Sequence, residues 1–275
     1  MNVLTQSRRA RFGLVCVAAA LAFNHTLLAS PGWLAALPAY PLVLLARGLE
    51  PQDPGLAVTF QYLATAWGRL LWLPVLLGGT VCGLRARDFG IYKGRWKEAL
   101  AATLVMWAAI ELVLAAASAL WNGPAWKPIP GRHSAAAMAA GVVYYFFGVA
   151  LFEEAFYRGF LVPQLFHAFR TRFARQAAVL LAVLVSQLFF ALAHLPHYRV
   201  PLPVPLGLTV LWLTGVLLAL MWLRTGNLLV GVGWHGLLDL PYHLTGAPPG
   251  WPEGAAYLVG LLVLAAWPLV RGRAR

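Results

Sequence analysis

The stretch ALAATLVMWAAIELVLAAASALW, residues 99–121, decides the fold, because it carries a single charged side chain, Glu111. A helix crosses the hydrocarbon core of a bilayer with about 20 consecutive apolar residues, and this run is long enough. Several further runs are similar. Of all 275 residues, 61% are hydrophobic and 11% are charged, whereas about a quarter are charged in a typical soluble domain. The chain is therefore predicted to be an integral membrane protein.

The predicted fold class is all-α, a polytopic bundle of about eight membrane-spanning helices. We expect the helices at residues 12–30, 57–83, 99–121, 136–165, 176–195, 205–223, 228–245 and 255–270. The stretch 31–56 holds five prolines, so it is interpreted as an interfacial or broken segment, with a ninth helix left open. No repeat or long linker divides the chain. One membrane domain over residues 1–275, with a catalytic core at about 136–245, is the simplest organisation.

The distribution of basic residues predicts the topology. The formal net charge is +12, and placing the N-terminus in the cytoplasm puts most of the 21 Lys and Arg on that side. These are Arg8, Arg9, Arg11, Arg85, Arg87, Lys93, Arg95, Lys97, Arg170, Arg172, Arg175, Arg224, Arg271, Arg273 and Arg275. Both termini are then cytoplasmic, and the charge reflects topology rather than nucleic-acid binding. The small size suggests a prokaryotic cytoplasmic membrane.

The two cysteines, Cys16 and Cys82, both fall inside apolar runs without CxxC or metal-type spacing. Free cysteines are often simply buried. We therefore expect them to be packing residues rather than a disulfide or a thiolate metal site.

Four of the nine acidic residues fall within predicted membrane helices: Glu111, Glu153, Glu154 and Asp239. A charged group at such depth costs about 2.5 to 3.5 kcal/mol on insertion scales, so it usually faces a cavity or a partner. Glu111, like His25 in the first helix, stands alone. For both we expect a bond to a neighbouring helix or exposure to water rather than chemistry.

The segment LFEEAFYR, residues 151–158, contains a carboxylate pair and an arginine. Glu154 and Arg158 are four residues apart, so they share a helix face and can form an ion pair. Glu153 is rotated by about 100° from Glu154 and can point into a different space. A buried structural ion pair is the alternative interpretation of this segment.

Two histidines accompany this segment on other helices. His194 ends the fifth apolar run, and His235 lies four residues before Asp239 on one face of the seventh. Either pattern alone is more typical of a hydrogen-bonded packing residue. His197, near His194, is a second-rank candidate.

Hydrolysis is the chemistry that unites these groups. A carboxylate can take a proton from water, and imidazoles can hold that water or donate to an oxyanion. Two histidines and a glutamate are equally a ligand set for catalytic zinc, although the chain has no HExxH helix. We favour a metal-independent glutamic-type site with no cofactor and keep zinc as the alternative.

These residues resemble the CPBP intramembrane endopeptidases, which include the CAAX prenyl proteases and the bacterial Abi proteins. The resemblance covers about residues 136–245. The family's first motif, two glutamates followed after three residues by arginine, matches Glu153, Glu154 and Arg158. The resemblance implies that Glu153 activates water, while Glu154 and Arg158 organise the site.

The second and third motifs lie on later helices. Phe-x-x-x-His matches Phe190 and His194, and His followed four positions later by Asn or Asp matches His235 and Asp239. The resemblance implies that His194 acts on the water with Glu153, and that His235 and Asp239 support the developing oxyanion. An ionised Asp239 would repel that oxyanion, so this side chain must be protonated or must instead orient a histidine.

The predicted function is therefore intramembrane endopeptidase activity on a membrane-associated protein or peptide, with the substrate and the lipid bilayer as partners. A transporter or proton relay would use the same buried groups. A family member retained for immunity or assembly without catalysis is a further alternative. The substrate, the side from which water enters and the oligomeric state stay open. By the expected boundaries, Glu153 lies towards the cytoplasmic end of its helix while His194 ends a helix that exits outward, so a tilted or broken helix is needed to join them.

The topology can be tested with alkaline phosphatase fusions, because this enzyme is active only outside the cytoplasm. A fusion after Arg275 should be inactive, and a control fusion after Lys127, in a predicted outer loop, should be active. High activity of the Arg275 fusion would contradict the positive-inside assignment.

Overall fold

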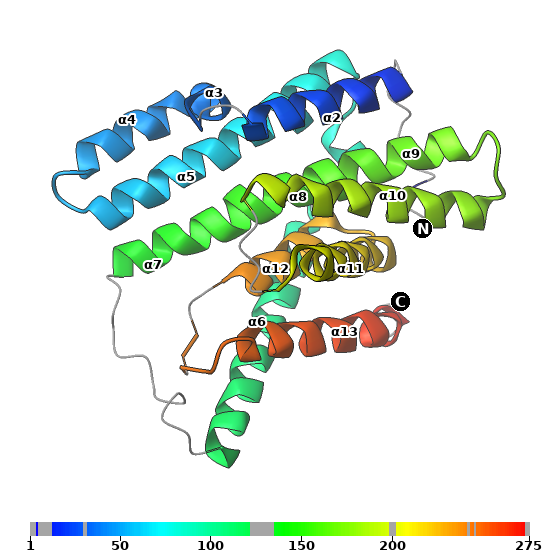
Figure 1. Ribbon diagram of the computed structural model, residues 1–275. Helices are drawn as coiled ribbons and strands as arrows, with labels where there is room; N and C mark the ends of the chain where they lie inside the picture. The colour runs from blue at the N-terminus through cyan, green and yellow to red at the C-terminus, as the bar shows by residue number, and fades with distance from the viewer. Residues whose placement is uncertain are drawn as a thin grey trace.

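The computed structural model describes residues 4, 13–29, 32–121, 135–197, 202–240, 243–244 and 246–272, and within them every regular element is helical (Figure 1). This confirms the predicted all-α class. The first half comprises α2 (Leu14–Ala29), α3 (Gly32–Ala36), η1 (Leu37–Ala39), α4 (Tyr40–Leu49), α5 (Pro54–Leu70), η2 (Leu71–Val81), η3 (Ala86–Phe89) and α6 (Trp96–Leu120). The second half comprises α7 (Ala135–Val142), η4 (Val143–Ala150), α8 (Leu151–Glu153), η5 (Glu154–Leu161), α9 (Val162–Phe169), α10 (Arg175–Ala193), η6 (Leu195–His197), α11 (Val204–Thr225), α12 (Leu228–Asp239) and α13 (Trp251–Gly272).

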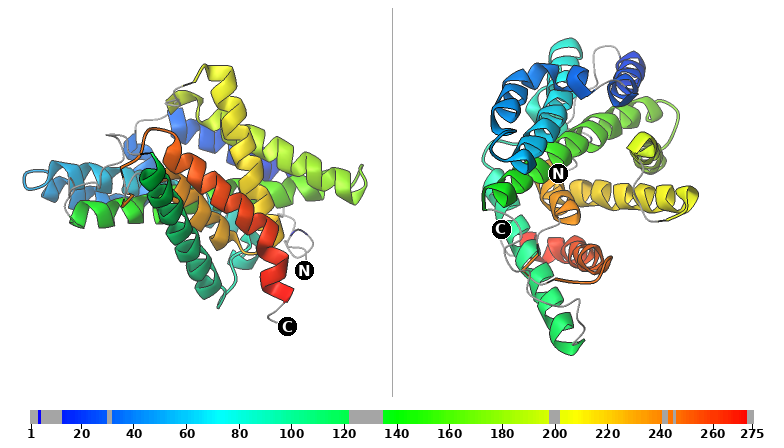
Figure 2. Two further views of the ribbon diagram at one scale, coloured as in Figure 1. Left: turned by 90° about the horizontal axis from the view of Figure 1, so that it is seen from below. Right: turned by 60° about the vertical axis from the view of Figure 1, so that its left-hand side comes forward.

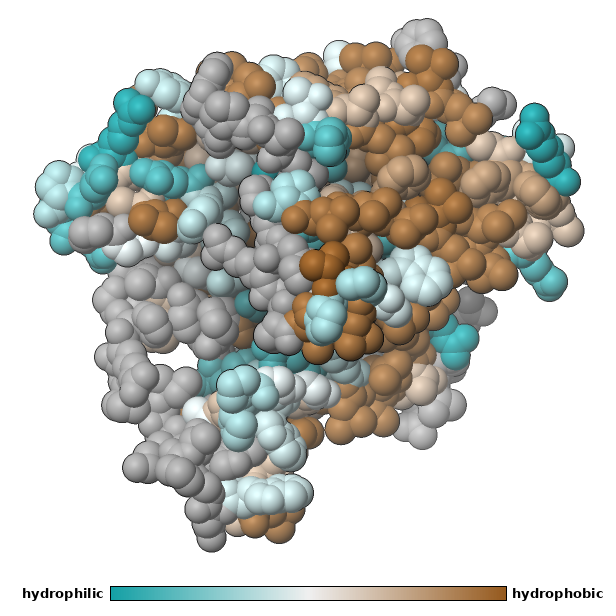
Figure 3. Space-filling view, in the orientation of Figure 1, coloured by the Kyte–Doolittle hydropathy of each residue, from teal (hydrophilic) through white to brown (hydrophobic). Residues whose placement is uncertain are grey.

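Four helices in the described ranges are long and apolar enough to cross a membrane: Trp96–Leu120, Met138–Phe169, Arg175–Ala193 and Val204–Thr225. Shorter apolar helices accompany them, so the count of eight spans stays a prediction. Hydrophilic residues gather at the α4–α5 turn and at the α9–α10 loop, and hydrophobic residues cover much of the right-hand part of the face shown in Figure 3. This distribution is that of a protein embedded in a bilayer.

The helix of the carboxylate motif is longer than predicted and has unusual internal hydrogen bonding. The elements from α7 to α9 follow one another without a break from Ala135 to Phe169, with π-helical bonding in η4 and η5. Insertions of this kind are frequent at functional sites. The proline-rich stretch 31–56 is broken, as expected, into α3, η1 and α4.

The described helices build two large hydrophobic clusters with α12 beside both, and a small third one joins Ala36, Ala39 and Ala64. One cluster involves α2, η2, η5, α9 and α10, and the other involves α6, α12 and α13. Helix α12 contacts η4 and η5 on one side and α6, α11 and α13 on the others (Figure 2). At 12 residues it is too short to span a bilayer, so its place is set by packing.

Glycines let α12 approach its neighbours closely. A Cβ added at Gly231 would lie 3.1 Å from Glu154 Oε2, and one added at Gly236 would lie 2.6 Å from the ring of Phe146. Small residues at helix interfaces allow such contact in membranes, where packing and hydrogen bonds replace the hydrophobic effect between helices. The polar side chain of Glu154 therefore lies directly against the backbone of α12.

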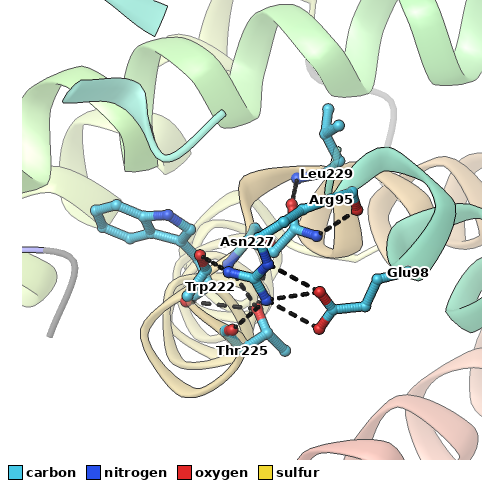
Figure 4. Close-up of polar contacts among 7 residues, drawn as sticks. Arg95, Glu98, Trp222, Thr225, Asn227 and Leu229 are labelled. Atoms are coloured by element: carbon cyan, nitrogen blue, oxygen red, sulfur yellow. Dashed lines mark hydrogen bonds and ion pairs between the residues drawn. The ribbon is translucent and has the colours of Figure 1, made fainter. Parts of the chain in front are cut away.

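Arg95, just before α6, anchors the start of α12 (Figure 4). Its guanidinium donates to both carboxylate oxygens of Glu98 at 2.8 Å and to the carbonyls of Thr225 and Gly226 at 3.1 and 2.6 Å. Asn227 Nδ2 in turn donates a hydrogen bond to the backbone carbonyl of Arg95 at 3.0 Å. The turn from α11 to α12 is thus held by one charged side chain.

Asn227 also caps α12 through its Oδ1, which accepts from the backbone N–H of Leu229 at 3.2 Å. Gly226, with φ of 63°, ends α11 in the left-handed conformation that glycine adopts at no steric cost. The backbone N–H of Leu228 donates to the carbonyl of Gly90 at 3.1 Å. The first turn of α12 is therefore bound to two separate loops.

The prediction that Cys16 and Cys82 are packing residues without a disulfide is wrong. The structure joins them in a disulfide, with their Cα atoms 6.6 Å apart. The bond links the first turn of α2 to the residue after η2. Both side chains are buried, as expected, but the pairing was invisible because 66 residues separate them.

We predict that Arg95→Ala destabilises the protein by about 2 kcal/mol, because charge-assisted hydrogen bonds to the α11–α12 turn are lost. The matched control is Arg87→Ala, since Arg87 is exposed in the same region of the chain and its side chain anchors no helix. Thermal unfolding in detergent measures both. Equal midpoints for the two variants would contradict the anchoring role.

Candidate active site

His235 of α12 lies at the centre of the predicted site residues. Its Nδ1 is 2.8 Å from Glu154 Oε1, while its Nε2 is 3.5 Å from both Glu153 Oε2 and Asp239 Oδ2. The imidazole side chain is only 6% exposed. Because a carboxylate oxygen accepts, Nδ1 donates to Glu154 and the other nitrogen faces Glu153 and Asp239.

The predicted pairing of Glu154 with Arg158 is present. Arg158 Nη1 lies 3.1 Å from Glu154 Oε1, and both side chains are 0% exposed. The guanidinium also donates to the carbonyl of Gly215 at 3.4 Å and stacks over the ring of Phe190 at 4.3 Å. A single oxygen of Glu154 therefore contacts both the arginine and His235.

Glu153 and Glu154 face opposite nitrogens of the same imidazole, in agreement with their predicted rotation around the helix. Glu153 ends α8 and Glu154 begins η5. Glu154 is completely buried, whereas the Glu153 side chain is 17% exposed. Glu153 is thus the more exposed of the two adjacent glutamates.

His194 lies next to this cluster but is not hydrogen-bonded to it within the described contacts. Its Nδ1 donates to the carbonyl of Phe190 at 2.8 Å, so the neutral ring presents Nε2 as an acceptor. The ring of Phe190 packs against His194 at 4.8 Å and against His235 at 6.2 Å between centroids.

The depth problem posed by the predicted boundaries disappears in the structure. Glu153 lies near the middle of the continuous 135–169 helix, not towards its cytoplasmic end. His194 caps α10 and is followed by the turn η6. The structure therefore gathers Glu153, Glu154 and Asp239 around His235, and His194 lies on the other side of the ring of Phe190 that packs against His235.

Sequence reasoning missed the polar residues that support this helix. Asn24 of α2 donates to the hydroxyl of Tyr157 at 3.1 Å, and Ser186 Oγ donates to the carbonyl of Tyr157 at 2.7 Å. Asn24 and Ser186 are buried polar residues in apolar helices, which was the only available signal. They fix η5 from two sides.

The residues that were assigned no chemistry also have defined positions. Glu111 accepts from His243 Nδ1 and from the backbone N–H of Leu244, both at 2.9 Å, so it binds the segment after α12 rather than a neighbouring helix. His25 is exposed, which is one of the two outcomes that the sequence analysis expected for it. The side chain of the second-rank candidate His197 lies outside what the structure describes.

A zinc site would use Nε2 of His235, because a histidine that binds a metal commonly donates its other ring nitrogen to a carboxylate, as Nδ1 does here to Glu154. Zinc takes about three protein ligands within 2.0 to 2.3 Å. Within the described ranges, no group of three His, Cys, Asp or Glu side chains is placed to hold a metal ion. The donor set is built around a hydrogen-bonded imidazole.

Fold and site together define a helical membrane protein with carboxylates and a histidine assembled in its apolar interior. Such groups can exchange protons with water and stabilise developing charge. Residues 135–241 match the family model described as Rce1-like, type II CAAX prenyl endopeptidase Rce1-like. This match confirms the resemblance to the CPBP family. The matched region contains all six predicted site residues.

No curated protein and no solved structure matches the chain significantly. The family match supports intramembrane protease activity in general, of the CAAX type. The four helices of the described ranges that are long and apolar enough to cross a membrane agree with an integral membrane protein.

The two adjacent glutamates should differ in their effect on stability. We predict that Glu154→Gln lowers the free energy of unfolding by about 3 kcal/mol, because it leaves the guanidinium of Arg158 buried without a counter-charge. Glu153→Gln should lower it by less than about 1 kcal/mol, since its nearest partner is 3.5 Å away. Thermal or denaturant unfolding in detergent compares them, and equal losses would argue against the structural role of Glu154.

Proposed function

We propose that this chain is an intramembrane endopeptidase that hydrolyses a peptide bond of a membrane-associated protein or peptide, with water activated by Glu153 and the histidines. The observation that carries the proposal is His235, buried in the bundle with Glu154 on one ring nitrogen and Glu153 with Asp239 on the other. A purely structural ion pair needs Glu154 and Arg158 only. It does not explain two further carboxylates around the same imidazole.

Glu153 is the proposed general base. Its carboxylate has partial exposure and lies beside Nε2 of His235, so a water molecule can reach it. The proton of that water passes to Glu153 as the water oxygen bonds to the carbonyl carbon of the substrate. His194, whose Nε2 is left as an acceptor, orients the same water. Proton transfer to a positioned side chain contributes about 10² to 10⁴ in rate.

His235 is the proposed oxyanion donor. The carbonyl oxygen of the substrate gains negative charge in this step, and the N–H at Nε2 of a protonated His235 can donate to it. Glu154 favours that protonated form by accepting from Nδ1. The C–N bond then breaks, Glu153 returns its proton to the leaving amine, and the products are an amine and a carboxylic acid, which loses its proton to water.

Asp239 is the proposed orienting residue for His235. It lies 3.5 Å from Nε2, and its side chain is 35% exposed. Because an ionised carboxylate this close to the oxyanion would repel it, Asp239 orients the imidazole in its protonated form during this step. Arg158 acts through Glu154 and is a positioning residue.

A metal-independent reaction is part of the proposal, and its support is that, among the described residues, no three His, Cys, Asp or Glu side chains are grouped to hold a metal ion. A CAAX-type prenylated peptide is the proposed substrate class, in keeping with the family description. Bacteriocin leaders and C-terminal sorting helices are the competing classes.

The test is cleavage of a fluorogenic farnesylated Cys-aliphatic-aliphatic-Ser peptide by the purified protein in proteoliposomes. We expect Glu153→Gln to reduce kcat at least about 100-fold, because the amide has the same shape but cannot take a proton. The matched control is Glu253→Gln, on the exposed first turn of α13, which should retain full activity. A chelator should leave the wild-type rate unchanged.

The outcomes separate the alternatives. Activity that vanishes with chelator and returns with zinc would replace the glutamate mechanism by a metal one. Full activity of Glu153→Gln would remove Glu153 from catalysis altogether. Absence of cleavage in the wild type, together with proton-coupled flux across the same vesicles, would favour the relay.

A further inference from the structure

Glu111 is a buried carboxylate that the proposed reaction does not use. It lies within α6, one of the helices long and apolar enough to cross a membrane, and its side chain is 8% exposed. One oxygen accepts from Nδ1 of His243 and the other from the backbone N–H of Leu244, both at 2.9 Å. The side chain of His243 is equally shielded, at 6% exposure. A charged group at this depth is costly without a partner, so the carboxylate and the two groups that it binds form one buried unit.

Helix α6 holds α12 at both ends. At the N-terminal end, Nδ2 of Asn227 donates to the carbonyl of Arg95, the residue just before α6. At the C-terminal end, Glu111 of α6 binds His243, four residues after α12 ends at Asp239. Both bonds join residues whose numbers differ by 132. The two segments therefore run side by side, in the same direction and in a constant register (Figure 2).

The two helices also touch between these ends. A Cβ added at Gly233 of α12 would overlap the side chain of Thr103 on α6. The start of α12 is secured further by the hydrogen bonds of Arg95 to the α11–α12 turn. Loss of the bonds of Glu111 should therefore free the last turn of α12 while its first turn stays docked.

The last turn of α12 carries Asp239, the residue proposed above to orient the catalytic imidazole. Leu240, the next residue, is extended, with φ of −70° and ψ of 115°, and it precedes Pro241. A residue before proline is restricted to such conformations, so the chain leaves Asp239 in a fixed direction. Four residues span at most about 14 Å, so the bond between Glu111 and His243 limits where Asp239 can lie.

We propose that Glu111 and His243 are positioning residues for the reaction, which fix Asp239 against Nε2 of His235 by holding the end of α12. The proposal rests on the proposed endopeptidase function, and neither residue touches the reacting atoms. Asp239 lies 3.5 Å from Nε2 with its side chain 35% exposed, so the site itself does not enclose it. A group at a reaction site needs support from surrounding residues, and the bond to α6 supplies it here.

The first test measures cleavage of the farnesylated peptide. We expect His243→Leu and Glu111→Leu to lower kcat at least about tenfold and to leave KM within about twofold. The reason is that misplacing a group at the reaction site by about 1 Å can slow the chemical step up to about 100-fold. His243→Asn should retain most of the activity, since its amide N–H can replace Nδ1 as the donor to Glu111. The matched control is His25→Leu, the same substitution at an exposed histidine, which should have the wild-type rate.

A double-mutant cycle shows whether the two residues act through Asp239. Asp239→Ala should slow the reaction, and adding His243→Leu to it should cause no further loss, because the group that His243 positions is already gone. If the two losses multiply instead, the proposal is overturned, since His243 would then act by another route. Wild-type kcat in both His243→Leu and Glu111→Leu would overturn it as well. Thermal unfolding in detergent checks that each variant is folded.

A spectroscopic readout separates this proposal from the catalytic one. The histidines are labelled with a nitrogen isotope, and the NMR signal of His235 is assigned by its loss in His235→Gln. Asp239→Asn should move this signal because it alters a group 3.5 Å from Nε2, and His243→Leu should move it in the same direction. This outcome supports the positioning role even if the wild type cleaves no peptide. A His235 signal that His243→Leu leaves unchanged would overturn it.

Discussion

The carboxylate of Glu154 is the contact on which the rest of the site depends. One oxygen lies 3.1 Å from Arg158 and 2.8 Å from His235, and both the glutamate and the arginine are shielded from solvent. In a low-dielectric interior none of these groups can be left alone, because an unpaired buried charge costs several kcal/mol. The long helix from Ala135 to Phe169 and the short helix α12 must therefore dock in the register that joins them.

Helix α12 shows how the fold meets that requirement. It is too short to be positioned by the bilayer, and its place is instead set at its N-terminus by Arg95 and Asn227. From there Gly231 brings the backbone against Glu154, and His235 follows one turn later. Hydrogen bonds at the N-terminus of α12 and close glycine contacts along its face thus position the buried imidazole of His235 beside the carboxylates.

The polar groups of the interior fall into distinct roles. Arg158 and Glu154 form an ion pair with each other. Asn24 and Ser186 support the same helix through hydrogen bonds to Tyr157. Glu153, the more exposed of the paired glutamates, keeps space for water beside His235. This division between structural and available charges is what a hydrolytic site inside a membrane requires, since catalytic groups must be rigidly held yet not fully satisfied.

The sequence by itself determined the helices and the contacts within them. Long apolar runs predict membrane helices, and a spacing of four residues predicts the pairing of Glu154 with Arg158 and the approach of Asp239 to His235. Contacts between helices were decided only by the tertiary structure. The disulfide of Cys16 with Cys82 and the bond of Glu111 to His243 both join distant segments. The physical reason is that local periodicity sets which face a side chain occupies, whereas packing sets what that face meets.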